Sequence, residues 1–141
     1  MWPLKFEQRL TSWNSLRSDC DTLSAVSALT EINQWWHLAP WRAYHLHWDD
    51  RPDWPDPWQL LSDNIYCELA KGLGIMYTLV LLDHPDIQDS CLVETDVGNL
   101  VLIDNEKYIL NWGKDIVVNT IHKRLNDRHI LHQQDLKNIL N

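Results

Sequence analysis

Four short apolar segments follow one another between residues 75 and 112, and they constrain the fold more than any other feature. In chain order they are IMYTLVLL (75–82), CLVET (91–95), NLVLID (99–104) and KYILNW (107–112). Each has the length of a β-strand, and the intervening TDVGN has the composition of a hairpin turn. We therefore expect an antiparallel sheet of about four strands.

Helical periodicity is present before this region. Residues 4–17 and 21–37 are predicted to be helices, and the second carries apolar residues at spacings of three and four. A central helix is expected to start at a cap within residues 62–64 and to run to about Leu73, with Gly72 and Gly74 ending it.

Helical patterns return after the strands, over residues 115–126 and 133–140. The order of these elements predicts an α+β fold in one domain, residues 1–141: N-terminal helices, a central helix, an antiparallel meander and further helices. The apolar positions of the C-terminal tail either complete the core or dock on a partner.

Composition limits the classes of partner. The formal net charge is −8, which argues against a nucleic-acid surface, since phosphates require a basic patch. No apolar run has the length of a membrane span, and the start of the chain lacks a secretory signal pattern. Three cysteines, an odd number, favour a reducing compartment such as the cytoplasm over a disulfide framework.

Tryptophan is the unusual residue here: the chain has nine, and six of them lie within a 24-residue stretch. Within that stretch, WRAYHLHW (41–48) alternates like a short strand, and DDRPDWPDP (49–57) is predicted to be an extended loop. The indoles either fill the core or anchor a protein partner. The candidate partner-binding residues are Trp41, Trp48, Trp54 and Trp58.

Cys67 is the candidate nucleophile, because it stands where the central helix is expected to begin. The first turn of a helix stabilises a thiolate through its N–H groups and dipole. Catalysis also requires a base and a group that orients the base. Asp104, at the end of an apolar run, is a candidate for the orienting carboxylate. The alternative is that Cys67 is an inert core residue.

Several short motifs in a fixed order extend this hypothesis. They are Asn33 followed by Trp35 and Trp36, Tyr44 followed by Asp49 or Asp50, Trp54 with Pro57 and Gln59, Cys67 with Glu68, and residues 100–105. In this order they resemble the bacterial transglutaminase-like cysteine proteinases, a branch of the papain-like transglutaminase fold. The resemblance implies a family-like core at 29–112, with helical extensions at 1–28 and 113–141.

The departures from this family concern the catalytic groups. The family's His-x-Val-Leu strand, aligned with CLVET, places Cys91 where the family has its catalytic His. A thiol does not replace imidazole as a base near neutral pH. Ile65, Tyr66 and Leu69 replace the Gly and the two Asp around the family's cysteine, so the acidic groups that bind calcium in some members are also lost. The resemblance thus implies a degenerate peptidase without metal or cofactor, in which positions 67, 91 and 104 converge.

Other residues offer alternatives for the missing base or for a metal. His84 follows the first predicted strand and is a candidate base if its loop folds back. His45 and His47 with Asp49 have a spacing seen in metal sites, although an exposed polar strand face is the simpler interpretation. His122, His129 and His132 are expected on the surface of the C-terminal helices. Cys67 and Cys91 are also candidates for a disulfide or a soft-metal pair.

Two functions follow from the sequence. The first is a non-catalytic structural or interaction subunit on a transglutaminase-like scaffold, with protein partners in a larger assembly or further copies of this chain. A bacteriophage virion is one such assembly, since proteins of this family occur there. The second is an active thiol hydrolase that uses Cys67 with a base from elsewhere. Whether the chain is an enzyme stays open, and the missing His favours the non-catalytic alternative.

Overall fold

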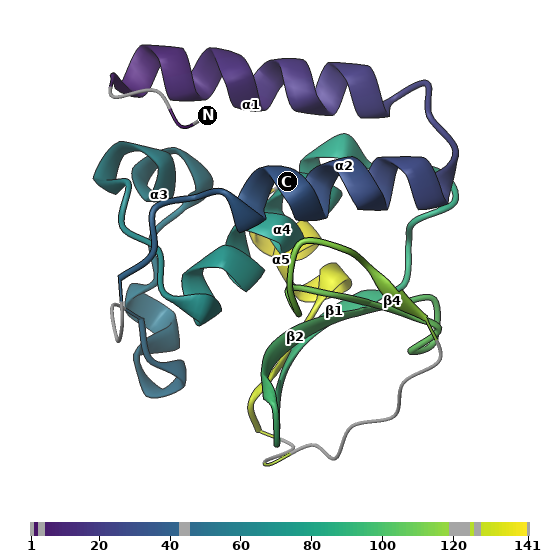
Figure 1. Ribbon diagram of the computed structural model, residues 1–141. Helices are drawn as coiled ribbons and strands as arrows, with labels where there is room; N and C mark the ends of the chain where they lie inside the picture. The colour runs from purple at the N-terminus through teal and green to yellow at the C-terminus, as the bar shows by residue number, and fades with distance from the viewer. Residues whose placement is uncertain (1, 3–4, 43–45, 119–124, 126–127, 141) are drawn as a thin grey trace.

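The computed structural model shows an α+β protein (Figure 1), and it describes every residue except 1, 3–4, 43–45, 119–124, 126–127 and 141. The helices are α1 (Phe6–Cys20), α2 (Ala25–His37), the 3-10 helix η1 (Trp48–Asp53), α3 (Pro57–Asp63), α4 (Glu68–Leu82) and α5 (Gln133–Leu140). The strands are β1 (Ser90–Thr95), β2 (Gly98–Ile103), β3 (Tyr108–Leu110), β4 (Val117–Val118) and β5 (Ile130–His132). The predicted fold class is confirmed at this level.

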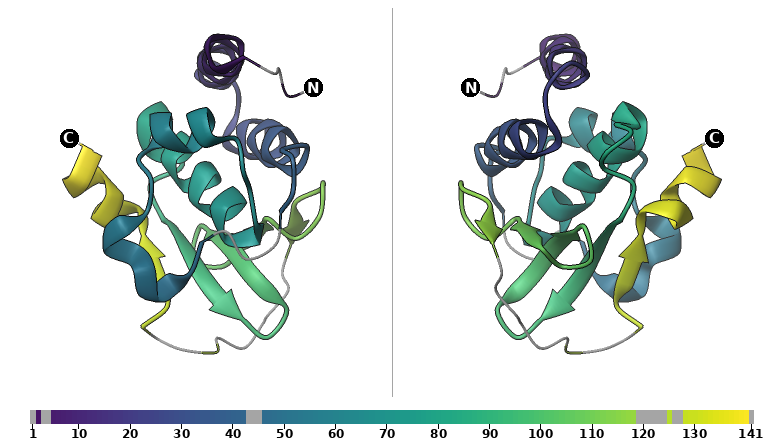
Figure 2. Two further views of the ribbon diagram at one scale, coloured as in Figure 1. Left: turned by 90° about the vertical axis from the view of Figure 1, so that its left-hand side faces the viewer. Right: turned by 90° about the vertical axis from the view of Figure 1, so that its right-hand side faces the viewer.

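Among the described residues, the sheet has five strands in the order β4-β3-β2-β1-β5, and every neighbouring pair is antiparallel. The β1–β2 hairpin predicted from TDVGN is present, with Leu92 opposite Val101. One face of the sheet packs against α4, as the two views in Figure 2 show. Side chains alternate between the faces, so the apolar residues of β1 divide between two separate clusters.

Helix α4 lies between the sheet and the N-terminal helices (Figure 1), and it includes the segment 75–82 that the sequence predicted to be a strand. That prediction was wrong, because a short apolar run buried on all sides has the same composition in a helix as in a strand. Gly72 and Gly74, expected to end the helix, lie within it. A Cβ at Gly74 would lie 2.5 Å from the ring of Trp36, so this glycine permits close packing with α2.

The N-terminal helices are joined to α4 through one buried hydroxyl. Thr78 Oγ accepts the indole N–H of Trp13 on α1 and of Trp36 on α2, each at 2.9 Å. The same hydroxyl donates to the Gly74 carbonyl at 2.8 Å. All three side chains are at most 1% exposed. Both acceptor positions and the single donor of the hydroxyl are therefore used.

The tryptophan-rich segment is more helical than predicted. Residues 49–53, expected in an extended loop, form most of η1, and α3 begins directly after Asp56. Asp56 caps α3 by accepting the N–H of Gln59 at 2.8 Å, and Pro57 occupies the first helical position. Of the predicted strand 41–48, Trp41 forms an isolated bridge with Tyr66, residues 43–45 lie outside the described part, and residue 48 starts η1.

The C-terminal tail contributes to the core. Leu131 on β5 and Leu136 on α5 are buried, and β5 pairs with β1, which favours the core alternative for the tail. The helix predicted at 133–140 is confirmed. The helix predicted at 115–126 is wrong at residues 117–118, which form β4 because they pair with β3. Residues 119–124 and 126 lie outside the described part.

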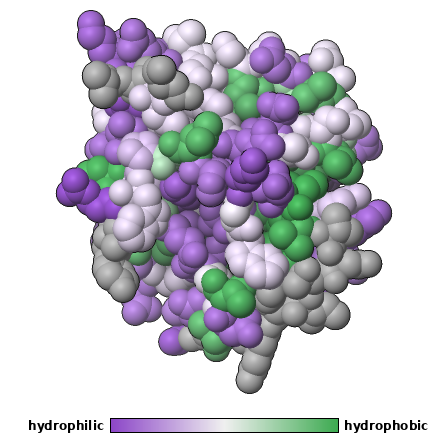
Figure 3. All heavy atoms as spheres, viewed as in Figure 1, coloured by the Kyte–Doolittle hydropathy of each residue, from purple (hydrophilic) through white to green (hydrophobic). Residues whose placement is uncertain are grey.

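The surface shows no large apolar face in the view of Figure 3, where hydrophobic residues form separate patches among hydrophilic ones. Within the described residues, no helix combines the length and the apolar composition that crossing a membrane requires.

Replacing Thr78 by Val is expected to lower the free energy of unfolding by about 2–4 kcal/mol, because two buried indole N–H groups would lose their acceptor. Thr78→Ser keeps the hydroxyl and is the matched control, with an expected cost of about 1 kcal/mol. Urea unfolding followed by tryptophan fluorescence measures both. Equal stability of the two variants would show that the hydroxyl is not needed.

Gly74→Ala is expected to lower Tm, although alanine favours a helix over glycine by about 1 kcal/mol. The new methyl group would overlap the buried Trp36 ring, and overpacking of this kind costs about 1–3 kcal/mol. Calorimetry of Gly74→Ala in the wild-type and Trp36→Phe backgrounds checks the cause, because the smaller ring should reduce the penalty. A higher Tm in the wild-type background would contradict the packing account.

Candidate functional site

Cys67 is the N-cap residue of α4, so the helix begins immediately after it. Its backbone is extended, with φ −83° and ψ 177°, and its side chain forms no capping hydrogen bond. The thiol is only 5% exposed, and its Sγ accepts the backbone N–H of Leu46 at 3.4 Å. Cys67 therefore lies at the start of the central helix, as expected. The cap predicted within residues 62–64 is wrong, because residues 62–63 end α3 and Asn64 is the C-cap of that helix.

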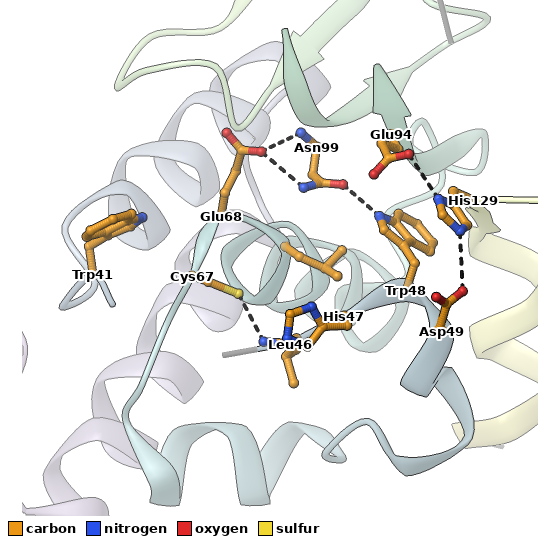
Figure 4. Close-up of a pocket in the computed structure, with 11 residues that line it drawn as sticks. Trp41, Leu46, His47, Trp48, Asp49, Cys67, Glu68, Glu94, Asn99 and His129 are labelled. Atoms are coloured by element: carbon orange, nitrogen blue, oxygen red, sulfur yellow. Dashed lines mark hydrogen bonds and ion pairs between the residues drawn. The ribbon is translucent and has the colours of Figure 1, made fainter. Parts of the chain in front are cut away.

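A pocket of about 510 Å³ lies in front of this helix end (Figure 4). Its walls come from the segment before η1, from η1 itself, from the start of α4, from the β1–β2 hairpin and from the residue before β5. The described lining residues are Trp41, Leu46, His47, Trp48, Asp49, Cys67, Glu68, Leu69, Glu94, Asn99 and His129. Segments from both halves of the chain thus meet at Cys67.

Asn99 at the start of β2 connects the two sides of the pocket (Figure 4). Glu68 Oε1 accepts its backbone N–H at 2.6 Å and its side-chain N–H at 3.1 Å. Asn99 Oδ1 in turn accepts the indole N–H of Trp48 at 2.7 Å. The carboxamide is therefore engaged at both ends, and it fixes the orientation of a carboxylate and of an indole.

Two further asparagines support this arrangement. Asn111 Nδ2 donates to the backbone carbonyls of Glu68 at 2.9 Å and of Asn99 at 2.8 Å. Its backbone N–H donates to Asn33 Oδ1 on α2 at 2.8 Å. Asn111 has φ 66°, a left-handed conformation that Asn tolerates better than most residues. This backbone conformation directs the side-chain amide of Asn111 toward the start of α4, where it binds the Glu68 carbonyl.

His129 occupies the other end of the pocket, between two carboxylates (Figure 4). Its Nδ1 lies 3.0 Å from Glu94 Oε1, and its Nε2 lies 3.8 Å from Asp49 Oδ1. The imidazole stacks on Trp48 with 5.4 Å between ring centroids. The indole lies between this histidine and Cys67 in the view of Figure 4, so imidazole and thiol are not adjacent there.

The structure does not bring Cys91 to Cys67. On β1, Leu92 faces α4, because a Cβ at Gly72 would lie 2.5 Å from its Cδ1. Cys91, the preceding residue, points to the opposite face of the sheet and packs in the second cluster with Val93. All three cysteines are thiols. Cys67 packs in the cluster on the α4 side of the sheet and Cys91 in the cluster on the other side, so the disulfide and soft-metal alternatives for this pair are also wrong.

Asp104 lies at the wrong end of the sheet. Residues 99 and 104 are five positions apart along β2, about 16 Å, and only residue 99 lines the pocket. Asp104 is exposed, and its backbone N–H donates to the carbonyl of Asp89, beyond the C-terminal end of α4. The predicted convergence of positions 67, 91 and 104 is therefore wrong. The physical reason is that side chains alternate along β1, which turns Cys91 away from α4, and that the pocket lies at the start of β2 whereas Asp104 follows its end.

Of the other histidines named from the sequence, the structure places His47 in the pocket and His84 away from it. His84 is buried at the far end of α4, where Nε2 bonds the Leu23 carbonyl and Nδ1 accepts the Asp86 N–H, so it does not serve Cys67. His47 lines the pocket, whereas His132 is exposed. His45 and His122 lie outside the described residues. Across the described residues, no three metal-binding side chains are grouped to hold an ion.

The four candidate partner-binding tryptophans divide into two kinds. Trp41 is 66% exposed and Trp58 is 46% exposed, as an interface anchor requires. Trp48 is buried and Trp54 is half-buried, and their rings contact each other at 5.3 Å between centroids. The core alternative thus holds for Trp48 and Trp54, and the partner-anchor alternative stays a prediction for Trp41 and Trp58.

Sequence reasoning did not propose three residues of this site. Asn99 and His129 line the pocket, and Asn111 supports it through its hydrogen bonds. The two asparagines follow turn or strand patterns, and asparagine is common at turns for conformational reasons alone. His129 lies more than sixty positions from Cys67, and only the pairing of β5 with β1 brings it near. The sequence signal for Asn99 is its position directly before the apolar run Leu-Val-Leu of β2, because a polar side chain there lies at the end of the sheet.

Comparison with known proteins adds no relative: neither a family model, nor a curated protein, nor a solved structure matches this chain.

Proposed function

We propose that this chain is a non-catalytic interaction subunit on a degenerate transglutaminase-like scaffold, and that it binds protein partners in a larger assembly. One observation carries the proposal: the side chains hydrogen-bonded to Glu68, the residue after Cys67, are the carboxamides of Asn99 and Asn111. A carboxamide does not accept a proton near neutral pH, so it cannot act as the base that activates a thiol.

A changed alignment with the family supports this interpretation. If the His-x-Val-Leu strand is matched to β2 instead of β1, residues 99–102 read Asn-Leu-Val-Leu, with Asn99 at the histidine position. The Leu-Val-Leu-Asp-Asn strand then corresponds to residues 108–112, Tyr-Ile-Leu-Asn-Trp, with Asn111 at the aspartate position. Both positions contact Glu68, next to Cys67. Under this alignment the thiol is kept and both of its catalytic partners are amides.

The exposed indoles support an interaction role. Trp41, at the mouth of the pocket, and Trp58, at the start of α3, present large rings to solvent. Rings of this kind are frequent anchors of protein interfaces. The resemblance further suggests a bacteriophage virion or assembly intermediate formed in the cytoplasm. Co-purification of the chain with assembled particles tests that part of the proposal.

The alternative is a thiol hydrolase, and a specific observation favours it. His47 lines the same pocket as Cys67 and directly follows Leu46, whose N–H contacts the sulfur. The pocket also contains the Glu94–His129 pair, which has the composition of a base with its orienting carboxylate. Either imidazole would have to move toward Cys67 to act on it, since no described hydrogen bond joins a histidine to the sulfur.

Alkylation by iodoacetamide separates the two functions. We expect Cys67 to react at pH 6 no faster than free cysteine, because the carboxamides bonded to the neighbouring Glu68 take no proton. Cys20 is the internal control: burial, followed by the nearby charges of Glu31 and Asp19, raises its pKa to about 11, so it should stay unmodified. Mass spectrometry of tryptic peptides gives the rate at each cysteine. Selective labelling of Cys67 at pH 6, faster than free cysteine, would contradict the proposal.

Asn99→His tests whether position 99 is the lost base position. A histidine there would stand beside Glu68 and within the pocket of Cys67, so we expect alkylation of Cys67 at pH 7 to become about tenfold faster or more. Asn99→Gln keeps a carboxamide and is the control. A histidine variant that folds and reacts no faster than the glutamine variant would argue against the changed alignment.

A further inference from the structure

We propose that the pocket in front of α4 receives an arginine side chain of the partner protein. This inference rests on the proposed function, since it names the chemistry by which the interaction subunit recognises its partner. It concerns the whole pocket, which has a defined volume, aromatic walls and fixed acidic groups.

The charge of the pocket selects a cation. Glu68, Glu94 and Asp49 line it, and the described lining residues include no Lys or Arg. The chain as a whole carries a net charge of −8, which adds to the attraction for a basic partner. A phosphate or carboxylate ligand would be repelled. An apolar ligand would leave the carboxylates partly desolvated without a compensating charge.

Two of these carboxylates are held in place before any ligand arrives. Glu68 Oε1 accepts both N–H groups of Asn99, and Glu94 Oε1 is paired with His129. None of these contacts uses Oε2 of Glu68 or of Glu94, so each carboxylate has acceptor capacity left. Because the side chains are already ordered, binding loses less conformational entropy than it would at free surface carboxylates.

The indoles favour guanidinium over other cations. Trp48 is fixed by its bond to Asn99 and has one face covered by the His129 imidazole. Trp41, on the other side of Glu68 in the view of Figure 4, is 66% exposed and offers its ring for stacking. A planar guanidinium can stack on an indole while its N–H groups reach a carboxylate. Lysine offers no planar group for stacking. The combination of acidic groups with flat aromatic walls therefore points to arginine.

The experiment titrates the full chain with acetyl-Ala-Arg-Ala-amide and follows the indole N–H signals by NMR. We expect the Trp48 signal to shift with a Kd in the millimolar range, as expected for one side chain, and the Kd to rise with salt. The probe acetyl-Ala-citrulline-Ala-amide has nearly the same shape without the charge, and it should cause no shift. Equal binding of both peptides, or no binding of the arginine peptide, would overturn the inference.

Variants locate the site. Glu94→Gln and Glu68→Gln should each weaken binding of the arginine peptide about threefold to tenfold, whereas Glu7→Gln on α1, which is exposed and does not line the pocket, should not change it. Two pocket variants are used because Glu68 also bonds Asn99, and loss of that bond alone could disturb the loop. Unchanged affinity in both pocket variants would place the binding elsewhere and overturn the inference.

The same samples distinguish this inference from the proposed function. Intact-mass spectrometry after the titration shows whether the peptide is cleaved or Cys67 is modified. Cleavage or a covalent adduct would overturn the non-catalytic function and leave the recognition of arginine standing. An intact peptide that does not shift Trp48 would overturn only the arginine inference.

Discussion

The burial of α4 on nearly every side is the constraint on which the rest of the structure depends. Its Thr78 hydroxyl accepts an indole N–H from each N-terminal helix, and Gly74 lets α2 approach to the contact distance of the Trp36 ring. The opposite side of the helix packs on the sheet through Leu92. Because these contacts leave α4 no freedom to shift, they also fix where its first residues lie, and Cys67 and Glu68 are at that end.

At that helix end, asparagine side chains form hydrogen bonds that link separate elements. Asn33 binds the end of β3 to α2, Asn111 binds the start of α4 to β2, and Asn99 joins Glu68 to Trp48. A carboxamide both donates and accepts without changing charge, so these links hold geometry and transfer no protons. The described lining of the pocket is therefore held by fixed hydrogen bonds and carries three acidic side chains. Such a site suits recognition better than catalysis, which is the basis of the proposed function.

Sequence reasoning succeeded where the pattern was local. The β1–β2 hairpin follows from strand composition around TDVGN. A helix near Cys67 was also expected, but its cap was predicted at 62–64, which is the end of α3. Sequence reasoning failed for residues 75–82, because burial on all sides removes the periodicity that separates a helix from a strand. The predicted convergence failed for a different reason: alternation along β1 points Cys91 away from α4, and Asp104 follows the end of β2 that is far from the pocket. His129 was expected on the surface of the C-terminal helices, and this was wrong, since it precedes β5 and reaches the pocket through the pairing of β5 with β1.

The most direct test of the central claim, that this pocket does not perform thiol chemistry, is the reaction of the chain with p-nitrophenyl acetate, followed by release of nitrophenolate and by intact mass. The account predicts the same slow release for the wild-type chain and for Cys67→Ser, without accumulation of an acetylated protein. A burst of nitrophenolate equal to the protein concentration, with acetylation at Cys67 and loss of the burst in the serine variant, would contradict it.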